Sequence, residues 1–210
     1  MSDSPVHEDF SGPYLSRRLH WQSEPAYWRL DREASRLVIE PDAGSDFWQR
    51  THYGFEADNG HFLFLEAPGD FVLTTEVTWH AVNQYDQAGL MVRMSKACWL
   101  KTSVEYEPEG PSRLGAVVTN MQFSDWSTQA LTRGVTTAWF RISANAGDFA
   151  VHWSLDGRGW EMLRLCHLQE HADIAPIRCG LYACSPKGTG FRAAFSFLDL
   201  SPASLMKAAL

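Results

Sequence analysis

The sequence predicts an all-β protein, built as a sandwich of two antiparallel sheets. Three observations predict it. Short segments of alternating apolar and polar residues recur, residues that favour turns separate them, and no long segment keeps the 3.6-residue period of an amphipathic helix. Such a pattern is typical of sandwiches and barrels. No linker rich in Pro and Gly divides the 210 residues. We therefore expect a flexible arm over residues 1–15, a single sandwich domain over residues 16–200 and a tail over residues 201–210.

The clearest predicted strand covers residues 71–79, in which Leu73 and Val77 alternate with Thr74 and Glu76. A period of two indicates a strand with one buried face. The same reasoning predicts further strands at residues 36–40, 62–66, 88–94, 99–106, 114–121, 136–143, 149–155, 160–165, 179–184 and 191–198.

Turn-forming residues lie between these strands. Glu-Gly-Pro-Ser at residues 109–112 and Ala-Gly-Asp at residues 146–148 are two examples. Asp156-Gly157 separates two alternating segments, which is a strong hairpin signature. A single helical turn is expected near residues 168–172, and the Ala-rich residues 201–210 favour a short helix.

The charge balance bears on partners and location. The chain carries 18 Lys and Arg against 25 Asp and Glu, a formal net charge of −7. This argues against nucleic-acid or anionic-membrane binding, which begins from a basic surface. No basic segment followed by an apolar run opens the sequence, and no apolar run approaches the ~18 residues of a membrane helix. We expect a cytoplasmic protein, for which a protein partner or a homo-oligomer stays open.

Four cysteines, at positions 98, 166, 179 and 184, form no Cys-x-x-Cys pair. In a protein without a secretory signal we expect them to be reduced and mostly buried. Cys166, His167 and His171 are conceivable metal ligands, but structural zinc needs four ligands in tight pairs and no second pair is evident. We predict no metal and no cofactor.

Some predicted strands pair an apolar face with a face that mixes indole and charge. Alternate residues of a strand lie on the same face, so residue numbers of equal parity (odd or even) share a face. On this basis the residues of the mixed faces are Gln87, Arg93, Trp99, Lys101, Glu105, Trp139, Arg141 and Ser143. A face exposed only to water would carry charge without Trp. A groove lined by both suits a sugar, because sugar rings stack on aromatic planes and hydroxyls need fixed polar partners. The alternatives are that the tryptophans are core residues and that the charges form an exposed ladder of ion pairs.

Two segments predicted as loops are dense in aromatic and polar residues. Residues 46–54 contain Trp48, and residues 120–127 contain Asp125 and Trp126. Such loops are costly to expose unless they close a pocket or contact a partner. The alternative is that their aromatic rings pack back onto the sandwich.

No motif of catalysis is present. A glycosidase needs two carboxylates about 5–9.5 Å apart across the scissile bond. Glu105 shares a face with Glu107, which lies in a predicted turn, and Glu76 is a second candidate. No nucleophile elbow, phosphate-binding loop or zinc-peptidase motif occurs. Glu105 is therefore a weak candidate for a catalytic acid or base.

Five segments, in this order, carry a resemblance to a known family. They cover residues 46–54, 85–93, 99–106, 124–127 and, as the fifth, 180–186 with 190–191. The sequence resembles the uncharacterised "regulation of enolase"-type family, which has a concanavalin A-like lectin/glucanase fold, over about residues 18–200. The resemblance implies a jelly-roll sandwich of two antiparallel sheets. It implies no settled activity, and the acidic catalytic pattern of the related glucanases is not matched.

We interpret the protein as a cytoplasmic β-sandwich that binds a small carbohydrate or sugar derivative. The predicted ligand-binding residues are Trp48, Gln87, Arg93, Trp99, Lys101, Glu105, Asp125 and Trp126. Of these, we expect the polar residues of the two strands to converge on one side of one sheet. Two alternatives stay open: an enzyme acting on a sugar or sugar acid with Glu105 as acid or base, and a protein-interaction module.

Overall fold

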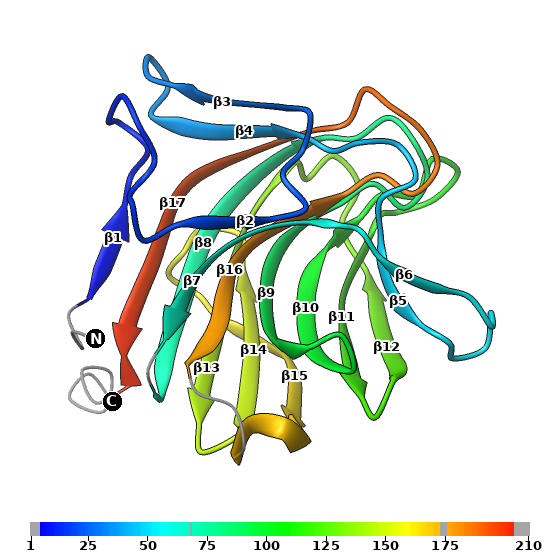
Figure 1. The fold of residues 1–210 in the computed structure, drawn as a ribbon. Coiled ribbons are helices and arrows are strands. Elements are labelled where there is room, and N and C mark those ends of the chain that lie inside the picture. The colour runs from blue at the N-terminus through cyan, green and yellow to red at the C-terminus, as the bar shows by residue number, and fades with distance from the viewer. Residues whose placement is uncertain (1–4, 68, 173–175, 204–210) are drawn as a thin grey trace.

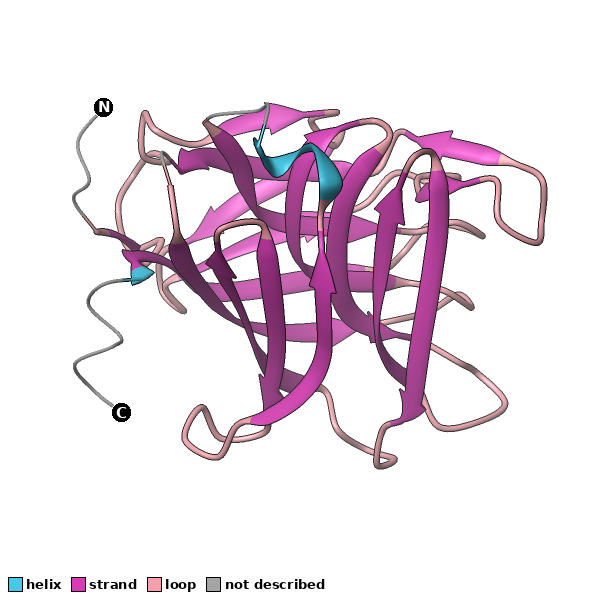
Figure 2. Ribbon diagram, turned by 90° about the horizontal axis from the view of Figure 1, so that it is seen from below, coloured by secondary structure: helices cyan, strands magenta, loops and turns pink. Residues whose placement is uncertain are grey.

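The computed structural model describes residues 5–67, 69–172 and 176–203. It is all-β, with two large antiparallel sheets packed face to face (Figures 1 and 2). The alternating strands predicted from the sequence form these sheets, so the predicted fold class is confirmed.

The seven-stranded sheet contains, in spatial order, β12 (Phe123–Ala130), β11 (Arg113–Asn120), β10 (Cys98–Glu105), β9 (Gln87–Ser95), β16 (Ile177–Cys184), β7 (His61–Ala67) and β2 (His20–Gln22). The eight-stranded sheet contains β15 (Glu161–His167), β14 (Asp148–Ser154), β13 (Thr137–Asn145), β8 (Phe71–His80), β17 (Arg192–Pro202), β4 (Arg36–Glu40) and β3 (Tyr27–Asp31), with β1 (Val6–Glu8) also paired to β17. A separate hairpin joins β5 (Phe47–Gln49) to β6 (Glu56–Asp58), and a short 3-10 helix, η1, spans Gln169–Ala172.

The main core lies between the two sheets, because each strand turns alternate residues toward the other sheet. Leu90 and Leu100 of the seven-stranded sheet and Phe140 and Ile142 of the eight-stranded sheet are fully buried in it. The faces of the two sheets that point away from this core are called here their outer faces.

A second, smaller apolar cluster lies on the outer face of the seven-stranded sheet. It is formed by Phe47, Trp48, Phe62, Met91, Trp99, Val117, Tyr182 and Cys184. This cluster exists because the β5–β6 hairpin folds over the sheet and buries Phe47 and Trp48 against it. Figure 1 shows the hairpin projecting from the side of the sandwich beside β12.

The described N-terminal residues correct the prediction of a flexible arm over residues 1–15, of which residues 1–4 lie outside the described ranges. Val6 pairs with Leu200 of β17, and the Phe10 side chain is fully buried in the main core. The two apolar side chains hold this segment, because burying each one stabilises the fold by about 1.5–3 kcal/mol. At the other end β17 continues to Pro202, and the short helix expected over residues 201–210 falls mainly on residues 204–210, outside the described residues.

The segment 120–127 also differs from its prediction, since it is a hairpin rather than a loop. Asn120 pairs with Phe123, so Met121 and Gln122 form a two-residue turn with φ angles of 51° and 68°. Two residues with positive φ are the geometry of a type I′ hairpin turn, which usually requires Asn or Gly. Neither is present at these two positions, so the residue types there do not indicate a turn.

All four cysteines are free thiols, and three of them, Cys98, Cys179 and Cys184, are buried. Among the described residues, no three His, Cys, Asp or Glu side chains gather in a group that would hold a metal ion. His167 instead binds Asp148, with 2.7 Å between the imidazole Nδ1 and a carboxylate oxygen. None of the helices in the described ranges is both long and apolar enough to cross a membrane.

Candidate functional site

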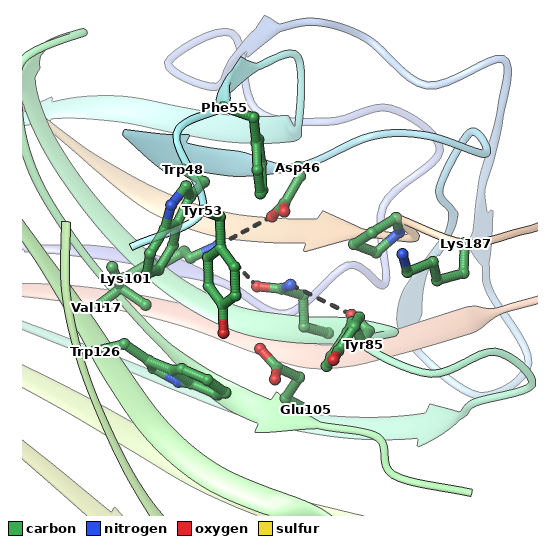
Figure 3. Close-up of a pocket in the computed structure, with 12 residues that line it drawn as sticks. Asp46, Trp48, Tyr53, Phe55, Tyr85, Lys101, Glu105, Val117, Trp126 and Lys187 are labelled. Carbon is green, nitrogen blue, oxygen red and sulfur yellow. Dashed lines mark hydrogen bonds and ion pairs between the residues drawn. The ribbon is translucent and has the colours of Figure 1, made fainter. Parts of the chain in front are cut away.

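A pocket of about 240 Å³ lies on the outer face of the seven-stranded sheet, beside the β5–β6 hairpin (Figure 3). The residues that line it are Asp46, Trp48, Tyr53, Phe55, Tyr85, Gln87, Lys101, Glu105, Val117, Trp126, Pro186 and Lys187. The sheet supplies the floor, and the hairpin and two loops supply the walls.

Strand pairing explains why the polar floor residues meet. Gln87 of β9 stands directly opposite Glu105 of β10, and Arg93 stands opposite Trp99. Lys101 lies between these two pairs on the same face, because side chains of equal parity share one side of a sheet. The prediction that Gln87, Arg93, Lys101 and Glu105 share one side of one sheet is confirmed.

Lys101 is the buried cation of the floor. Its Nζ donates to the Phe47 carbonyl at 2.8 Å, to Gln87 Oε1 at 2.9 Å and to Asp46 Oδ1 at 3.3 Å. Three acceptors match the three N–H groups of an ammonium, so the charge is compensated inside the protein. Two of these acceptors belong to the start of the hairpin, and Lys101 therefore ties the hairpin to the sheet.

Glu105 is the polar group of the floor that is left free. It is partly buried, and the structure gives its carboxylate no hydrogen-bond donor within the described ranges. Burial raises the pKa of Glu105 to about 7, and the nearby Lys101 ammonium only partly opposes this effect. At neutral pH both protonation states of Glu105 are populated, so it can donate a hydrogen bond as well as accept one.

Aromatic rings form the walls. Trp48, Tyr53 and Phe55 come from the hairpin, with the Tyr53 ring 5.6 Å from that of Trp48 and 6.1 Å from that of Phe55. Tyr85 and Trp126 stand on either side of Glu105 in Figure 3. Tyr53 and Phe55 are more exposed than Trp48, which is almost fully buried. The exposed rings are the ones available to a ligand.

A small recess of about 10 Å³ adjoins the pocket, and Ser103, Glu105, Arg113 and Gly115 contribute to its lining. That volume is about the size that one water molecule requires. The recess therefore offers room for one water or one hydroxyl group beside the Glu105 carboxylate.

Five of the eight predicted ligand-binding residues line the pocket, namely Trp48, Gln87, Lys101, Glu105 and Trp126. Trp99 does not: it is fully buried, its ring lies 6.2 Å from that of Phe47, and its Nε1 donates to the Lys96 carbonyl at 3.2 Å. It belongs to the smaller apolar cluster, as the alternative interpretation held.

Arg93 and Asp125 are the other two corrections. Arg93 lies under the hairpin, where its guanidinium makes a bidentate ion pair with Asp58 of β6 at 2.7 and 2.9 Å. Asp125 is one residue from Trp126, so it points to the opposite face of β12 and pairs with Arg164 of β15 at 3.1 Å. Neither residue reaches the pocket.

The pocket also contains residues that the sequence interpretation missed: Asp46, Tyr53, Phe55, Tyr85, Val117, Pro186 and Lys187. Asp46 and Tyr53 lie in the aromatic segment already singled out, so its density was the available signal. Tyr85, Pro186 and Lys187 come from loops that only the folded chain brings together.

The mixed strand that carries Trp139 and Arg141 is not part of this site. It is β13, and it belongs to the eight-stranded sheet, whose outer face points the other way. The alternation of residues along this strand indicates that one of its faces is mixed, but it does not indicate which sheet the strand joins.

The chain matches the family model described as "Protein of unknown function (DUF1349)" over residues 21–203. It belongs to this family. It is 34% identical over 183 residues to "Regulation of enolase protein 1" of Saccharomyces cerevisiae, covering 86% of this chain and 88% of the relative. The predicted membership of the "regulation of enolase"-type family is confirmed.

Two solved structures place the fold. A crystal structure of a functionally unknown protein from Saccharomyces cerevisiae has a TM-score of 0.80 and 31% identity, covering 88% of this chain and 96% of that one. A xylan beta-1,4-xylosidase from Bacillus halodurans has a TM-score of 0.74 and 13% identity, covering 96% of this chain but only 40% of the enzyme. At that identity, the second likeness is one of fold alone.

Proposed function

We propose that this protein binds a small carbohydrate or sugar derivative in the pocket beside the β5–β6 hairpin. The observation that carries the proposal is a combination found in one pocket. It joins two exposed aromatic rings, Tyr53 and Phe55, and the partly buried Trp126 to a carboxyl group, Glu105, that has no hydrogen-bond donor among the described residues. Stacking on the rings and hydrogen bonding to the carboxyl group are the two interactions that a sugar ring requires.

The shape of the pocket also supports a small ligand. A hollow of about 240 Å³ is large enough for a sugar ring, whereas a protein partner is generally met by a broader surface. The likeness to a xylosidase supports only the fold, so the proposal depends on the pocket itself.

The test is a thermal-shift screen of the whole chain against neutral sugars, sugar acids and sugar phosphates, followed by calorimetric titration. A ligand that binds only the folded state stabilises it by about 2.7 kcal/mol at a hundred times its Kd. We expect at least one sugar to raise the Tm of the wild type but not that of Trp126→Ala. The matched control is Trp28→Ala, because Trp28 lies in β3, on the other sheet.

The screen also has an outcome that rejects the proposal. If no sugar of any class raises the Tm, or if every sugar that does so acts equally on Trp126→Ala, then the pocket is not a sugar site. A protein recovered on immobilised wild type but not on the Tyr53→Ala variant would favour the protein-interaction alternative instead.

A second candidate function, acid–base catalysis on a sugar, is favoured by one observation. Glu105 has a pKa of about 7, close to the value that suits proton transfer at neutral pH, and a second carboxylate, Asp46, lines the same pocket. Once a ligand is known, Glu105→Gln should keep its binding and abolish its turnover. If turnover continues in Glu105→Gln, Glu105 is not the catalytic acid or base. If the wild type leaves the ligand unchanged, the protein is a binding module.

A further inference from the structure

The outer face of the eight-stranded sheet carries a pair of basic residues away from the pocket. Arg141 of β13 and His152 of β14 stand directly opposite each other in the strand pairing. On the other side of β13, Thr74 of β8 stands opposite Arg141, and Glu76 stands opposite Trp139. Two groups that can be cations therefore face each other across one strand pair.

The guanidinium of Arg141 is held in place by stacking. Its Cζ lies 3.7 Å from the centroid of the Trp160 ring. Trp160 follows the β14–β15 turn, in which the Asp156 carboxylate accepts the backbone N–H groups of Arg158 at 2.8 Å and Gly159 at 2.9 Å. An Arg stacked on an aromatic ring presents its N–H groups in a fixed plane and loses little freedom when it binds.

The same turn is folded onto the sheet. Gly157 has a φ of 70°, and a Cβ there would lie 3.1 Å from Trp139 Nε1. Only glycine combines that backbone conformation with such close contact. The turn therefore covers Trp139 and places Trp160 over Arg141.

Both basic side chains lack partners where they are buried. Arg141 Nε and His152 Nδ1 are buried nitrogen atoms without a hydrogen-bond partner. No described carboxylate pairs with Arg141, although Glu76 is a neighbour along β8. These two atoms are closed to solvent, so a ligand would contact the other nitrogen atoms of the two side chains, the Arg141 Nη atoms and His152 Nε2, for which no hydrogen bond is seen among the described residues.

We propose that Arg141 and His152 form a binding site for a small oxyanion, the phosphate or carboxylate group of a ligand. The guanidinium fork matches the two oxygen atoms of such a group, and the imidazole supplies a further N–H. A water molecule at these nitrogen atoms would leave the partly buried charge of Arg141 uncompensated, whereas an anion would compensate it.

The charges around the site give the proposal a pH dependence. Burial lowers the pKa of both Arg141 and His152, and the Arg141 charge lowers that of His152 further. The groups facing the pair are Thr74 and Glu76 from β8, Trp139 and Ser143 from β13 itself, Met162 from β15, and Trp160. The negative charge of a bound anion opposes this lowering of the His152 pKa. Anion binding should therefore raise the His152 pKa and be tighter at lower pH.

The experiment titrates the whole chain with inorganic phosphate and, in a parallel arm, with malonate. Affinity is measured by calorimetry, and the His152 pKa by NMR. The wild type should bind at least one of the two and show a raised His152 pKa. Arg141→Gln should weaken binding at least tenfold, and Arg141→Lys, which keeps the charge but not the planar fork, should fall between them. Binding of phosphate without malonate would assign the site to phosphate groups, and the reverse to carboxylates.

Matched controls separate this site from the pocket and from misfolding. Arg158→Gln removes an exposed Arg of the same turn and should bind like the wild type. Trp126→Ala alters the sugar pocket and should not change anion binding. The proposal is wrong if wild type binds neither anion, or if a folded Arg141→Gln binds as wild type does. It is also wrong if an anion binds to Glu76→Gln but not to the wild type, because Glu76 would then be the counter-ion of Arg141.

Discussion

The two ends of one face of the seven-stranded sheet differ in what covers them. At one end Arg93 and Trp99 lie beneath the β5–β6 hairpin, and both are almost fully buried. At the other end Glu105 is only partly buried and lines the pocket, together with Gln87, which is itself buried. These residues come from the same two strands and share the same parity. The difference shows that a mixed indole and charge face becomes a binding surface only where no other segment of the chain covers it.

Charge compensation follows the same division. At the covered end, the carboxylate of Asp58 neutralises Arg93 and the hairpin buries the pair. At the open end, Glu105 has no donor among the described residues, and its pKa is raised by burial. A polar group that the protein leaves unpaired at an opening is available to a ligand, whereas a paired one serves the fold.

The largest effect should come from the covered end. Trp99→Ala removes a fully buried indole from the smaller apolar cluster and leaves a cavity beneath Phe47. We expect a loss of about 3–5 kcal/mol in the free energy of unfolding. Urea unfolding followed by circular dichroism measures it. A loss below about 1 kcal/mol, the size of an ordinary substitution, would mean that Trp99 is not a core residue in solution.

The second effect concerns the ion pair that fastens the hairpin. Arg93→Ala leaves the Asp58 carboxylate partly buried without its partner, which should cost about 2–3 kcal/mol of stability. The double variant Arg93→Ala with Asp58→Ala should recover part of that loss, because no charge is then left unpaired. Additive losses in this double-mutant cycle would contradict a direct coupling. The matched control is Arg29→Ala, which breaks an exposed pair with Asp31 and should leave the stability close to that of the wild type.

The sequence predicts the fold well because alternation is a local property. The longer strands, such as β8 and β13, contain enough residues to show a period of two. The three-residue strands β1, β2, β5 and β6 do not, and the structure forms them by pairing with distant segments or by packing over them. No local pattern in 46–54 could show that this segment begins a hairpin that covers Trp99.

The site could be predicted in part for a related reason. Parity places Gln87, Lys101 and Glu105 on one face, and strand pairing then brings them together. Parity also places Asp125 and Trp126 on opposite faces, but only if their segment is recognised as a strand. It was interpreted as a loop, because Met121 and Gln122 turn the chain without Asn or Gly. Lys187 and Tyr85 reach the pocket through loops, for which sequence spacing gives no position.

The third effect is a pH dependence that should come from the open end. The pKa of Glu105 rises from its ordinary value of 4.5 to about 7 on folding, so the folded state binds a proton that the unfolded state releases. Stability is therefore full below about pH 4.5, falls as the pH rises toward 7 and stays lower above it. Glu105→Gln should remove this part of the pH dependence and be more stable than wild type at pH 8 by about 1–3 kcal/mol.

Urea unfolding at several pH values from 4.5 to 8 measures that effect as the difference between variant and wild type, which cancels the other titrating groups. Glu66→Gln, on the exposed side of β7, is the matched control and should follow the wild-type curve. Parallel curves for Glu105→Gln and wild type would show that Glu105 titrates normally in the folded protein.

The smallest effect on stability, and the sharpest contrast with Trp99, should come from Trp126. This indole is only partly buried at the wall of the pocket, and it lies on β12, the edge strand of the sheet. Trp126→Ala should therefore cost about 1 kcal/mol or less in the free energy of unfolding, since the ring leaves no closed cavity. A sugar found by the thermal-shift screen should nevertheless bind Trp126→Ala at least tenfold more weakly, because the stacking surface is gone. Calorimetry measures the affinity and urea unfolding the stability. A stability loss as large as that of Trp99→Ala would mean that Trp126 is also a core residue, and the contrast between the covered and open ends would fail.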